Sequence, residues 1–373
     1  MKKDWTYKKL GEVTTKICDG SHNPPHGVEY SKYPMLSSKN IFFDRYDYES
    51  PRYLSKEDFE IEDKRTNVSD GDVLLTIVGT VGRTCCVMAP YTPFTLQRSV
   101  AVLKPKKEMM LSRFLMYSLH SLSALWETEA KGVAQKGVYL KQVANIQIPI
   151  PSLDEQQQIV AELDLLSGMI EKQKAQIEEL NKLAQSIFYD MFGDPVANEK
   201  GWELKKLEDC CKNLDSKRKP ITAKDREPGN IPYYGASGVV DHVKDYIFDG
   251  DYLLVSEDGA NLIFRHTPIA FSISGKTWVN NHAHILKFET SYEQTYFEYS
   301  INLRDISEYV TGCAQPKFTQ ANLNALLVAY PPLSLQQEFA AKIEAIEAMK
   351  AKVRQSLKES ETLFNSRMDY YFN

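Results

Sequence analysis

The chain of 373 residues contains no run of about 18 apolar residues, so it predicts no membrane-spanning helix. Its first five residues, Met-Lys-Lys-Asp-Trp, lack the apolar core of a secretory signal. Cysteine is scarce: six residues, at 18, 85, 86, 210, 211 and 313, include two adjacent pairs and no Cys-x-x-Cys spacing. This pattern favours reduced thiols over a disulfide framework. We therefore expect a cytoplasmic protein that is not attached to a membrane.

Motifs of catalysis and cofactor binding are also missing. The chain has no Gly-x-x-x-x-Gly-Lys-Ser/Thr loop, no Gly-x-Gly-x-x-Gly turn and no Gly-x-Ser-x-Gly elbow. Asn23-Pro24-Pro25-His26 resembles the Asn/Asp-Pro-Pro-aromatic motif of amino-methyltransferases, but histidine replaces the aromatic residue. A proline-stiffened loop is the favoured interpretation. We expect no catalytic residue and no cofactor in this chain.

Histidines at 282 and 284 share one face of a predicted strand. Two imidazoles without a nearby third ligand do not make a zinc site, so a hydrogen-bonding role is favoured and no metal is expected.

Positive charge is in short supply, since the net charge is -5. The net charge therefore argues against a protein that binds nucleic acid by bulk positive charge alone. The charge is unevenly distributed. Residues 1–150 carry 21 basic and 17 acidic side chains, whereas residues 151–200 carry 4 and 10. Residues 201–331 carry 14 and 17. The first third is thus mildly basic, and the acid is concentrated just after it.

An internal repeat organises the chain. Four motifs occur twice in the same order: Trp-x-x-Lys-Lys-Leu at 5–10 and 202–207, Asp-Gly-Asp-x-Leu-Leu at 70–75 and 249–254, Gly-x-Ala-Gln at 132–135 and 312–315, and Pro-x-Leu-x-x-Gln-Gln at 151–157 and 331–337. The offset falls from 197 to about 180, so the first copy holds about 17 extra residues near its start. Four matches in one order indicate two copies of one unit.

Each copy has a strand-rich part followed by a helical part. Buried strands are predicted after the Asp-Gly turns, at 72–78 and 252–256, and helices near 111–129 and 291–310. After Pro151 the chain runs to Phe192 without proline. Positions from 159 to 191 alternate in steps of four and three and are apolar except Gln173, which is typical of a coiled-coil seam.

The matching positions of the second copy form a weaker seam, with Lys350, Ser360 and Arg367 at inward positions. Two such helices bury their stripes most simply against each other, in antiparallel fashion. The predicted seam consists of Ile159, Leu163, Leu166, Ile170, Ile177, Leu180, Ile187, Phe339, Ile343, Ile346, Val353, Leu357 and Phe364.

The predicted fold is therefore α+β: two mixed α/β domains joined by two long helices that form an antiparallel coiled coil. The expected boundaries are 1–150 for the first domain, 151–193 for the first helix, 194–201 for a connector, 202–331 for the second domain and 332–373 for the second helix.

These features resemble the specificity subunit of Type I restriction-modification systems, and the resemblance covers essentially the whole chain. The most specific parts are Pro-Ser-Leu-Asp-Glu-Gln-Gln at 151–157 and the segment from Tyr-Gly-Ala-Ser-Gly at 234–238 to Asn-Asn-His-Ala-His at 280–284. The resemblance implies two target-recognition domains, each reading one half of a split, asymmetric site on double-stranded DNA.

The same resemblance implies partners. The helices are expected to set the spacer between the half-sites and to dock two methyltransferase subunits, which bind S-adenosylmethionine and methylate adenine. Two motor-nuclease subunits are expected to hydrolyse ATP with magnesium and to cleave unmodified DNA.

Polar, glycine-flanked loops supply the candidate DNA-binding residues, because Arg, Lys, Asn and Gln can contact base edges and phosphates. The candidates in the first copy are Lys39, Asn40, Arg83, Gln97, Arg98 and Lys136. Those in the second are Lys217, Arg218, Tyr234, Ser237, Asn261, Lys276, Asn281, His282 and Lys317. Two alternatives stay open: a scaffold that binds only protein, and a self-sufficient methyltransferase that uses the Asn-Pro-Pro segment.

Overall fold

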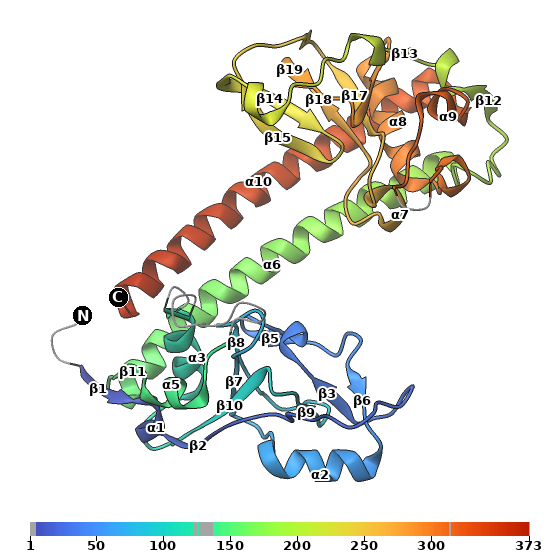
Figure 1. The fold of residues 1–373 in the computed structure, drawn as a ribbon. Helices are drawn as coiled ribbons and strands as arrows, with labels where there is room; N and C mark the ends of the chain where they lie inside the picture. Colours follow the sequence, from blue (N-terminus) through green and yellow to red (C-terminus); the bar gives the residue numbers. More distant parts are fainter. Residues whose placement is uncertain (1–4, 123–124, 127–136, 313–314, 373) are drawn as a thin grey trace. The chain divides into compact units, whose positions relative to one another are not determined.

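The computed structural model describes residues 1–373 except 1–4, 123–124, 127–136, 313–314 and 373. The chain divides into two compact units (Figure 1). The first unit comprises residues 1–172 and 356–373, and the second comprises residues 173–355. Each unit therefore contains one strand-rich domain and parts of both long helices.

Antiparallel pairing dominates the first unit. Its main sheet has the strand order β2 (Thr14–Asp19), β10 (Val100–Pro105), β7 (Val73–Thr76), β8 (Thr84–Cys86). The other pairings are β1 (Thr6–Lys9) with β11 (Gln147–Ile150), β4 (Ile41–Phe42) with β5 (Arg45–Tyr46), and β3 (Pro34–Leu36) with both β6 (Arg52–Tyr53) and β9 (Thr95–Leu96). The helices are α1 (Leu10–Val13), α2 (Lys56–Thr66), α3 (Ser112–His120) and α5 (Leu140–Asn145).

The second unit repeats this plan. Its main sheet has the order β13 (Lys212–Asn213), β20 (Ala283–Lys287), β17 (Tyr252–Ser256), β18 (Ala270–Ile273), and β12 (Glu203–Lys206) pairs with β21 (Leu327–Tyr330). A further sheet has the order β15 (Gly238–Val243), β14 (Pro228–Gly235), β19 (Lys276–Val279), β16 (Phe248–Asp249). The helices are α7 (Asn261–Phe264), α8 (Ser291–Leu303) and α9 (Gln320–Asn324). Since both main sheets share one strand order, the predicted duplication is visible in the topology.

The central strands β7 and β17 form the base of each core. Each follows a glycine at positive φ, Gly71 (85°) or Gly250 (140°), a backbone conformation that side chains with a Cβ rarely adopt. All residues of both strands are buried, and α3 or α8 packs nearby. The repeated Asp-Gly-Asp motif thus turns the chain into the buried strand.

Both predicted helices of the domains are shorter than expected. Helix α3 ends at His120, and residues 123–124 and 127–129 of the predicted helix lie outside the described residues. Helix α8 ends at Leu303 rather than near 310. The carboxylate of Asp305 accepts hydrogen bonds from the backbone N–H of Ser307, at 2.8 Å, and from its hydroxyl. This local turn competes with helix continuation, which explains the early end of α8.

Two 40-residue helices, α6 (Leu153–Phe192) and α10 (Leu333–Phe372), contribute to both units. Their repeated Gln-Gln motif has a structural cause. Gln156 is fully buried, and its amide group donates to the carbonyls of Met109 and Pro151 and accepts from the N–H of Leu111. Gln336, also fully buried, donates to the carbonyl of Pro331. The first glutamine of the motif therefore ties the start of each long helix to the preceding proline.

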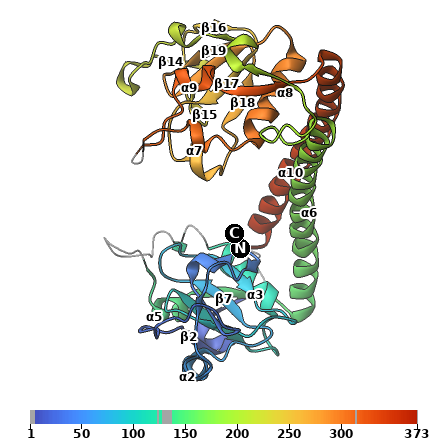
Figure 2. The ribbon, with the colours of Figure 1, turned by 90° about the vertical axis from the view of Figure 1, so that its right-hand side faces the viewer.

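The two helices are antiparallel, as predicted (Figure 2). In the first unit the beginning of α6 meets the end of α10, where Arg367 Nη2 donates to Glu162 Oε2 at 2.9 Å. In the second unit the end of α6 meets the beginning of α10, where the rings of Phe192 and Phe339 lie 5.2 Å apart.

The structure also places every candidate seam residue. Ile159, Leu163, Leu166, Ile170, Phe339, Ile343, Ile346 and Phe364 are buried, and Ile177, Leu180, Ile187, Val353 and Leu357 are half-buried. Two of the polar inward positions form ion pairs: Lys350 pairs with Glu347 and Arg367 with Glu162. Within the described residues, no helix is long and apolar enough to cross a membrane.

Replacing Leu163 with alanine should lower the free energy of unfolding by about 2–5 kcal/mol, because Leu163 is fully buried where α6 enters the first core. Leu165, two residues along, is 65% exposed, so Leu165→Ala should change it by no more than about 0.5 kcal/mol. Urea denaturation of both variants measures the difference. Equal losses would contradict this assignment of the buried face.

Candidate nucleic-acid interface

In the second unit, three polar loops lie side by side at the end of strand β17. The N–H of Glu257 donates to the carbonyl of His282 at 2.9 Å, and the N–H of Phe318 donates to the carbonyl of Glu257 at 2.8 Å. A third bond joins Gly259 to the carbonyl of Pro316 at 3.1 Å. These bonds bring residues 257–260, 280–282 and 315–318 to one edge of the domain.

Three of the predicted DNA-binding residues meet on that edge. Asn281, His282 and Lys317 are all exposed. His282 Nδ1 lies 2.8 Å from a carboxylate oxygen of Asp258, which fixes the imidazole ring on the surface. This edge therefore presents an amide, an imidazole and an ammonium group, all of which can contact bases or phosphates.

The first unit builds the same edge with other side chains. The N–H of Ile77 donates to the carbonyl of Ser99, and the N–H of Val138 donates to the carbonyl of Ile77, both at 2.9 Å. Arg98 is exposed beside them, and Gln97 is half-buried. The backbone bonds repeat those of the second unit, so the two copies differ in the chemistry they present and not in the frame.

A buried aspartate supports each edge. Asp19 ends β2 and lies opposite Ala101, and Asp215 follows β13 and accepts the N–H of Ile285 at 2.9 Å. Their exposed fractions are 6% and 7%. Each carboxylate binds one histidine and one arginine: His22 and Arg65 in the first unit, His284 and Arg218 in the second.

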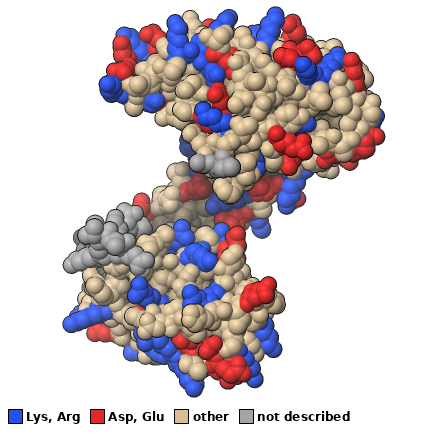
Figure 3. Space-filling view, turned by 45° about the vertical axis from the view of Figure 1, so that its right-hand side comes forward, with Lys and Arg blue, Asp and Glu red and all other residues tan. Residues whose placement is uncertain are grey.

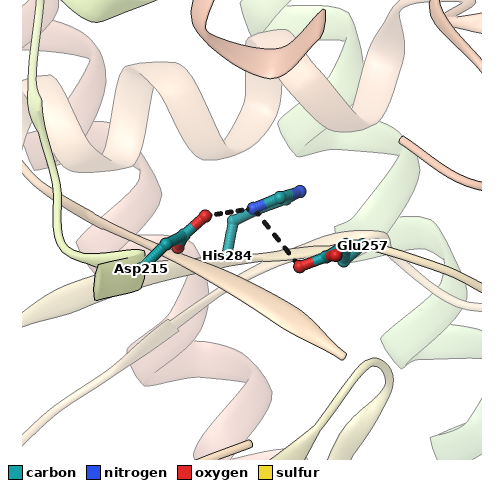
Figure 4. A group of neighbouring side chains, drawn as sticks. All are labelled: Asp215, Glu257 and His284. Carbon is teal, nitrogen blue, oxygen red and sulfur yellow. Dashed lines mark hydrogen bonds and ion pairs between the residues drawn. The ribbon is translucent and has the colours of Figure 1, made fainter. Parts of the chain in front are cut away.

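In the second unit, the side chains of Asp215, Glu257 and His284 point toward one another (Figure 4). His284 is fully buried, and its Nδ1 lies 2.6 Å from Asp215 Oδ2 while its Nε2 lies 2.7 Å from the carbonyl oxygen of Phe318. Both ring nitrogens of His284 therefore face hydrogen-bond acceptors. The guanidinium of Arg218 pairs with the carboxylates of Asp215 and Glu257.

Burial alone would raise the pKa of Asp215, but the hydrogen bond and charge of His284, the N–H of Ile285 and the charge of Arg218 outweigh burial and lower this pKa. Asp215, Glu257 and His284 form the one group among the described residues with metal-ligand geometry. Both ring nitrogens of His284 already lie within hydrogen-bond distance of protein acceptors, and Arg218 pairs with both carboxylates, so each member of the group has a partner within the protein. The group therefore ties three segments of chain together.

Several predicted DNA-binding residues are engaged within their own domains. The guanidinium of Arg218 donates to Glu257 and to the carbonyl of Ala283, and its side chain is 12% exposed. The Asn40 amide is buried and bonds within the 37–49 loop. The Asn261 amide bonds both ways with the backbone of Thr267. These three residues shape loops, and in this conformation they have little left to offer a ligand.

Other candidates lie in loops beside the two edges or farther along the chain. The N–H of Ser38, next to Lys39, donates to Ser99 Oγ at 3.0 Å, and the carbonyl of Tyr234 accepts from the N–H of Asn280 at 3.0 Å. Lys39 donates to the carbonyl of Ser50, and Arg83 donates to the carbonyl of Ile41. Lys276 lies over the ring of Tyr246, and the half-buried Tyr234 packs near Phe271. Lys217 is exposed after β13, and Ser237 is exposed at the turn between β14 and β15. Lys136 lies outside the described residues.

The sequence analysis missed Arg65 as a candidate. Arg65 stands near the end of α2, where its sequence signal is that of an ordinary charge on a helix surface. The structure brings its guanidinium to Asp19, 46 residues earlier in the chain. Only the spatial pairing of α2 with β2 makes Arg65 part of the edge, and no local pattern encodes that pairing.

The charge distribution agrees with an interface in the first unit. The face of this unit that is turned to the viewer in Figure 3 carries Lys and Arg side chains among uncharged residues, with acidic side chains mostly toward its rim. The Asn-Pro-Pro segment, in contrast, is already engaged. Arg52 Nη1 donates to the carbonyl of Pro25 at 2.8 Å and to that of Pro24 at 3.3 Å. Each of these carbonyls therefore already accepts a hydrogen bond within the domain.

A family model described as "Type I restriction modification DNA specificity domain" matches residues 2–182 and again 199–359. The Type I restriction enzyme MjaIX specificity subunit of Methanocaldococcus jannaschii is 25% identical over 92% of this chain and 87% of its own length.

Two further relatives match in part. A putative specificity subunit of Haemophilus influenzae is 30% identical over 39% of this chain, and the EcoBI specificity subunit of Escherichia coli is 34% identical over 51% of it. The match spans about two fifths of the length of each. Among solved structures, the S subunit from M. genitalium has a TM-score of 0.56 at 15% identity and covers 98% of this chain and 95% of its own, which shows a common fold.

Replacing Asp215 with asparagine should lower the free energy of unfolding by about 3–5 kcal/mol at neutral pH, because Arg218 then loses a buried counter-charge and His284 loses its carboxylate partner. The pKa of Asp215 is lowered in the folded protein, so its contribution is complete above the unfolded value of about 3.9. The contribution is lost as the pH falls through the lowered folded value.

Denaturant titration at several pH values measures this difference. Asp245→Asn is the matched control, since Asp245 is exposed, and it should change the free energy of unfolding by no more than about 0.5 kcal/mol. A loss for Asp215→Asn that does not shrink in acid would show that its charge is not the cause.

Proposed function

The chain belongs to the Type I restriction-modification DNA specificity family, and from this premise we propose that each of its units reads one half of a split, asymmetric site on double-stranded DNA. Members of the family are the non-catalytic components of their systems. Reading would take place on the two loop edges. Because its DNA lies in the cytoplasm, the subunit is proposed to work there.

The observation that carries this proposal is the duplicated edge with divergent side chains. Both units keep the same backbone bonds and a buried aspartate, yet one presents Arg98 and the other presents Asn281, His282 and Lys317. Base edges are distinguished by the pattern of donors and acceptors that a protein offers them. Two domains that share a backbone arrangement but expose different side chains can recognise two different half-sites.

The proposed partners are two methyltransferase subunits, which hold S-adenosylmethionine and methylate adenine, and two motor-nuclease subunits, which use ATP and magnesium. The long helices supply the surface for docking and the length that sets the spacer. Apolar side chains remain exposed on α6 at Leu165 (65%), Met169 and Leu183, and on α10 at Met349 and Leu363. Exposed apolar residues along a helix that already buries another stripe favour a second contact with protein.

A protein-only scaffold is the alternative, and retention of duplex DNA by the assembled complex discriminates between the two. A self-sufficient methyltransferase is disfavoured by the engagement of the Pro24 and Pro25 carbonyls with Arg52. Mapping methylated adenine in cells that express this chain with its methyltransferase tests the proposal. A split motif with a fixed gap supports it. Absence of methylation, with a stable complex and an active methyltransferase, would contradict it.

Replacing Asn281 with alanine should relax one base position in the half-site read by the second unit. Asparagine reads adenine through two hydrogen bonds, so the loss of discrimination should be about 1–3 kcal/mol. The motif of methylated adenine, compared between wild type and variant, measures it. Arg98→Ala is the counterpart and should alter the other half-site only. A change in both half-sites from either variant would contradict separate reading.

A further inference from the structure

A hollow of about 490 Å³ opens at the edge of the first unit. Its polar wall carries Asp19, His22, Arg65 and Arg98. The rest of its lining is largely apolar, with Ile77, Val78, Val138 and Leu140. The hollow therefore combines two guanidinium groups with a surface that does not favour a strongly hydrated ligand.

Arg65 is held in one orientation by the chain itself. Its Nε donates to the backbone carbonyl of Asp19 at 2.8 Å, and its Nη2 pairs with the carboxylate of Asp19. The side chain of Asp19 is 8% exposed, whereas that of Arg65 is 49% exposed. One edge of the guanidinium is thus fixed against a buried carboxylate, and the head remains open to solvent.

The opposite edge of Arg65 is available. No other described residue accepts a hydrogen bond from Nη1, and Nη2 uses one of its two hydrogens on Asp19. A guanidinium carries five N–H groups in a planar fork, so the edge formed by Nη1 and Nη2 keeps two parallel donors. Two parallel, pre-oriented donors fit a planar ligand with two adjacent acceptors.

We propose that Arg65 reads a guanine in the half-site bound by the first unit, with Asp19 as the residue that positions it; this inference rests on the proposed function. The O6 and N7 atoms of guanine are two adjacent acceptors in the major groove, and arginine contacts them bidentately. Asp19 lowers the entropy that the arginine loses on binding, because it already fixes the side chain.

A phosphate is the other ligand with adjacent acceptors, and two observations favour the base. The carboxylate of Asp19 offsets the charge of Arg65 and so weakens its attraction for an anion. The apolar lining of the hollow suits a base better than a hydrated phosphate.

The matching group of the second unit is engaged within the domain. Its buried aspartate holds Arg218, but Glu257 and the carbonyl of Ala283 take the remaining edge of that guanidinium. The two units therefore differ at the arginine that pairs with the buried aspartate. In the first unit this arginine keeps two N–H donors for a ligand, whereas in the second unit the corresponding donors bond within the domain. A guanine contact of this kind is expected in one half-site only.

The test uses the full chain in complex with its methyltransferase, with the methylation motif and binding to duplex DNA as readouts. Arg65→Lys keeps the charge and can still pair with Asp19, but an ammonium cannot hold Asp19 and also present two parallel donors. One guanine position of one half-site should lose its preference by roughly five- to 150-fold, while the other half-site and the gap stay unchanged. Lys64→Ala, at the exposed neighbouring position, should leave the motif unchanged.

Asp19→Asn should weaken the same preference and no other, because Arg65 then loses its positioning partner. An equal loss of binding to every sequence, with the motif unchanged, would overturn the inference in favour of a phosphate contact. A motif and binding identical to those of Lys64→Ala would also overturn it and assign Arg65 a structural role. Failure of the wild-type complex to give a split motif would instead reject the proposed function itself.

Discussion

Each of the two long helices carries an apolar stripe that it cannot bury alone, and the rest of the molecule is arranged around the contact that covers both stripes. The contact is antiparallel, so each unit receives the beginning of one helix and the end of the other. Leu163 and Phe364 belong to the core of the first unit, and Phe188 and Phe339 to that of the second. Neither domain core is complete without a helix that begins in the other copy.

The two copies keep the same backbone arrangement but differ in the side chains that they expose at the loop edges. The strand orders, the loop bonds and the buried aspartates Asp19 and Asp215 recur. The arginine that pairs with the aspartate comes from a different position in each copy. Arg65 belongs to α2, whereas Arg218 follows its aspartate by three residues. The residues that maintain the backbone arrangement thus differ from those that would contact DNA, so two specificities can share one fold.

The duplicated fold and the paired helices were predictable from the sequence, because the period of apolar residues indicates which side chains are buried. The alternating steps from Ile159 onward and the Pro-x-Leu-x-x-Gln-Gln motif predicted the paired helices, and Gln156 shows why the motif is needed. The site was harder to predict. Arg218 and Asn40 are of residue types that can contact DNA, but their side chains form hydrogen bonds within their own domains. Arg65 becomes part of the candidate site through its contact with Asp19, 46 residues earlier in the chain. Residue type is visible in a sequence, whereas the direction of a hydrogen bond depends on the folded neighbour.

The claim that the two units are separate readers on a common frame is tested most directly by a chain that carries the first reader twice. Residues 202–331 would be replaced by residues 5–150, with both long helices kept. Mapping of methylated adenine in cells expressing this chain with its methyltransferase should then give a split motif whose two halves are the same sequence on opposite strands. Retention of the original asymmetric motif would contradict the account.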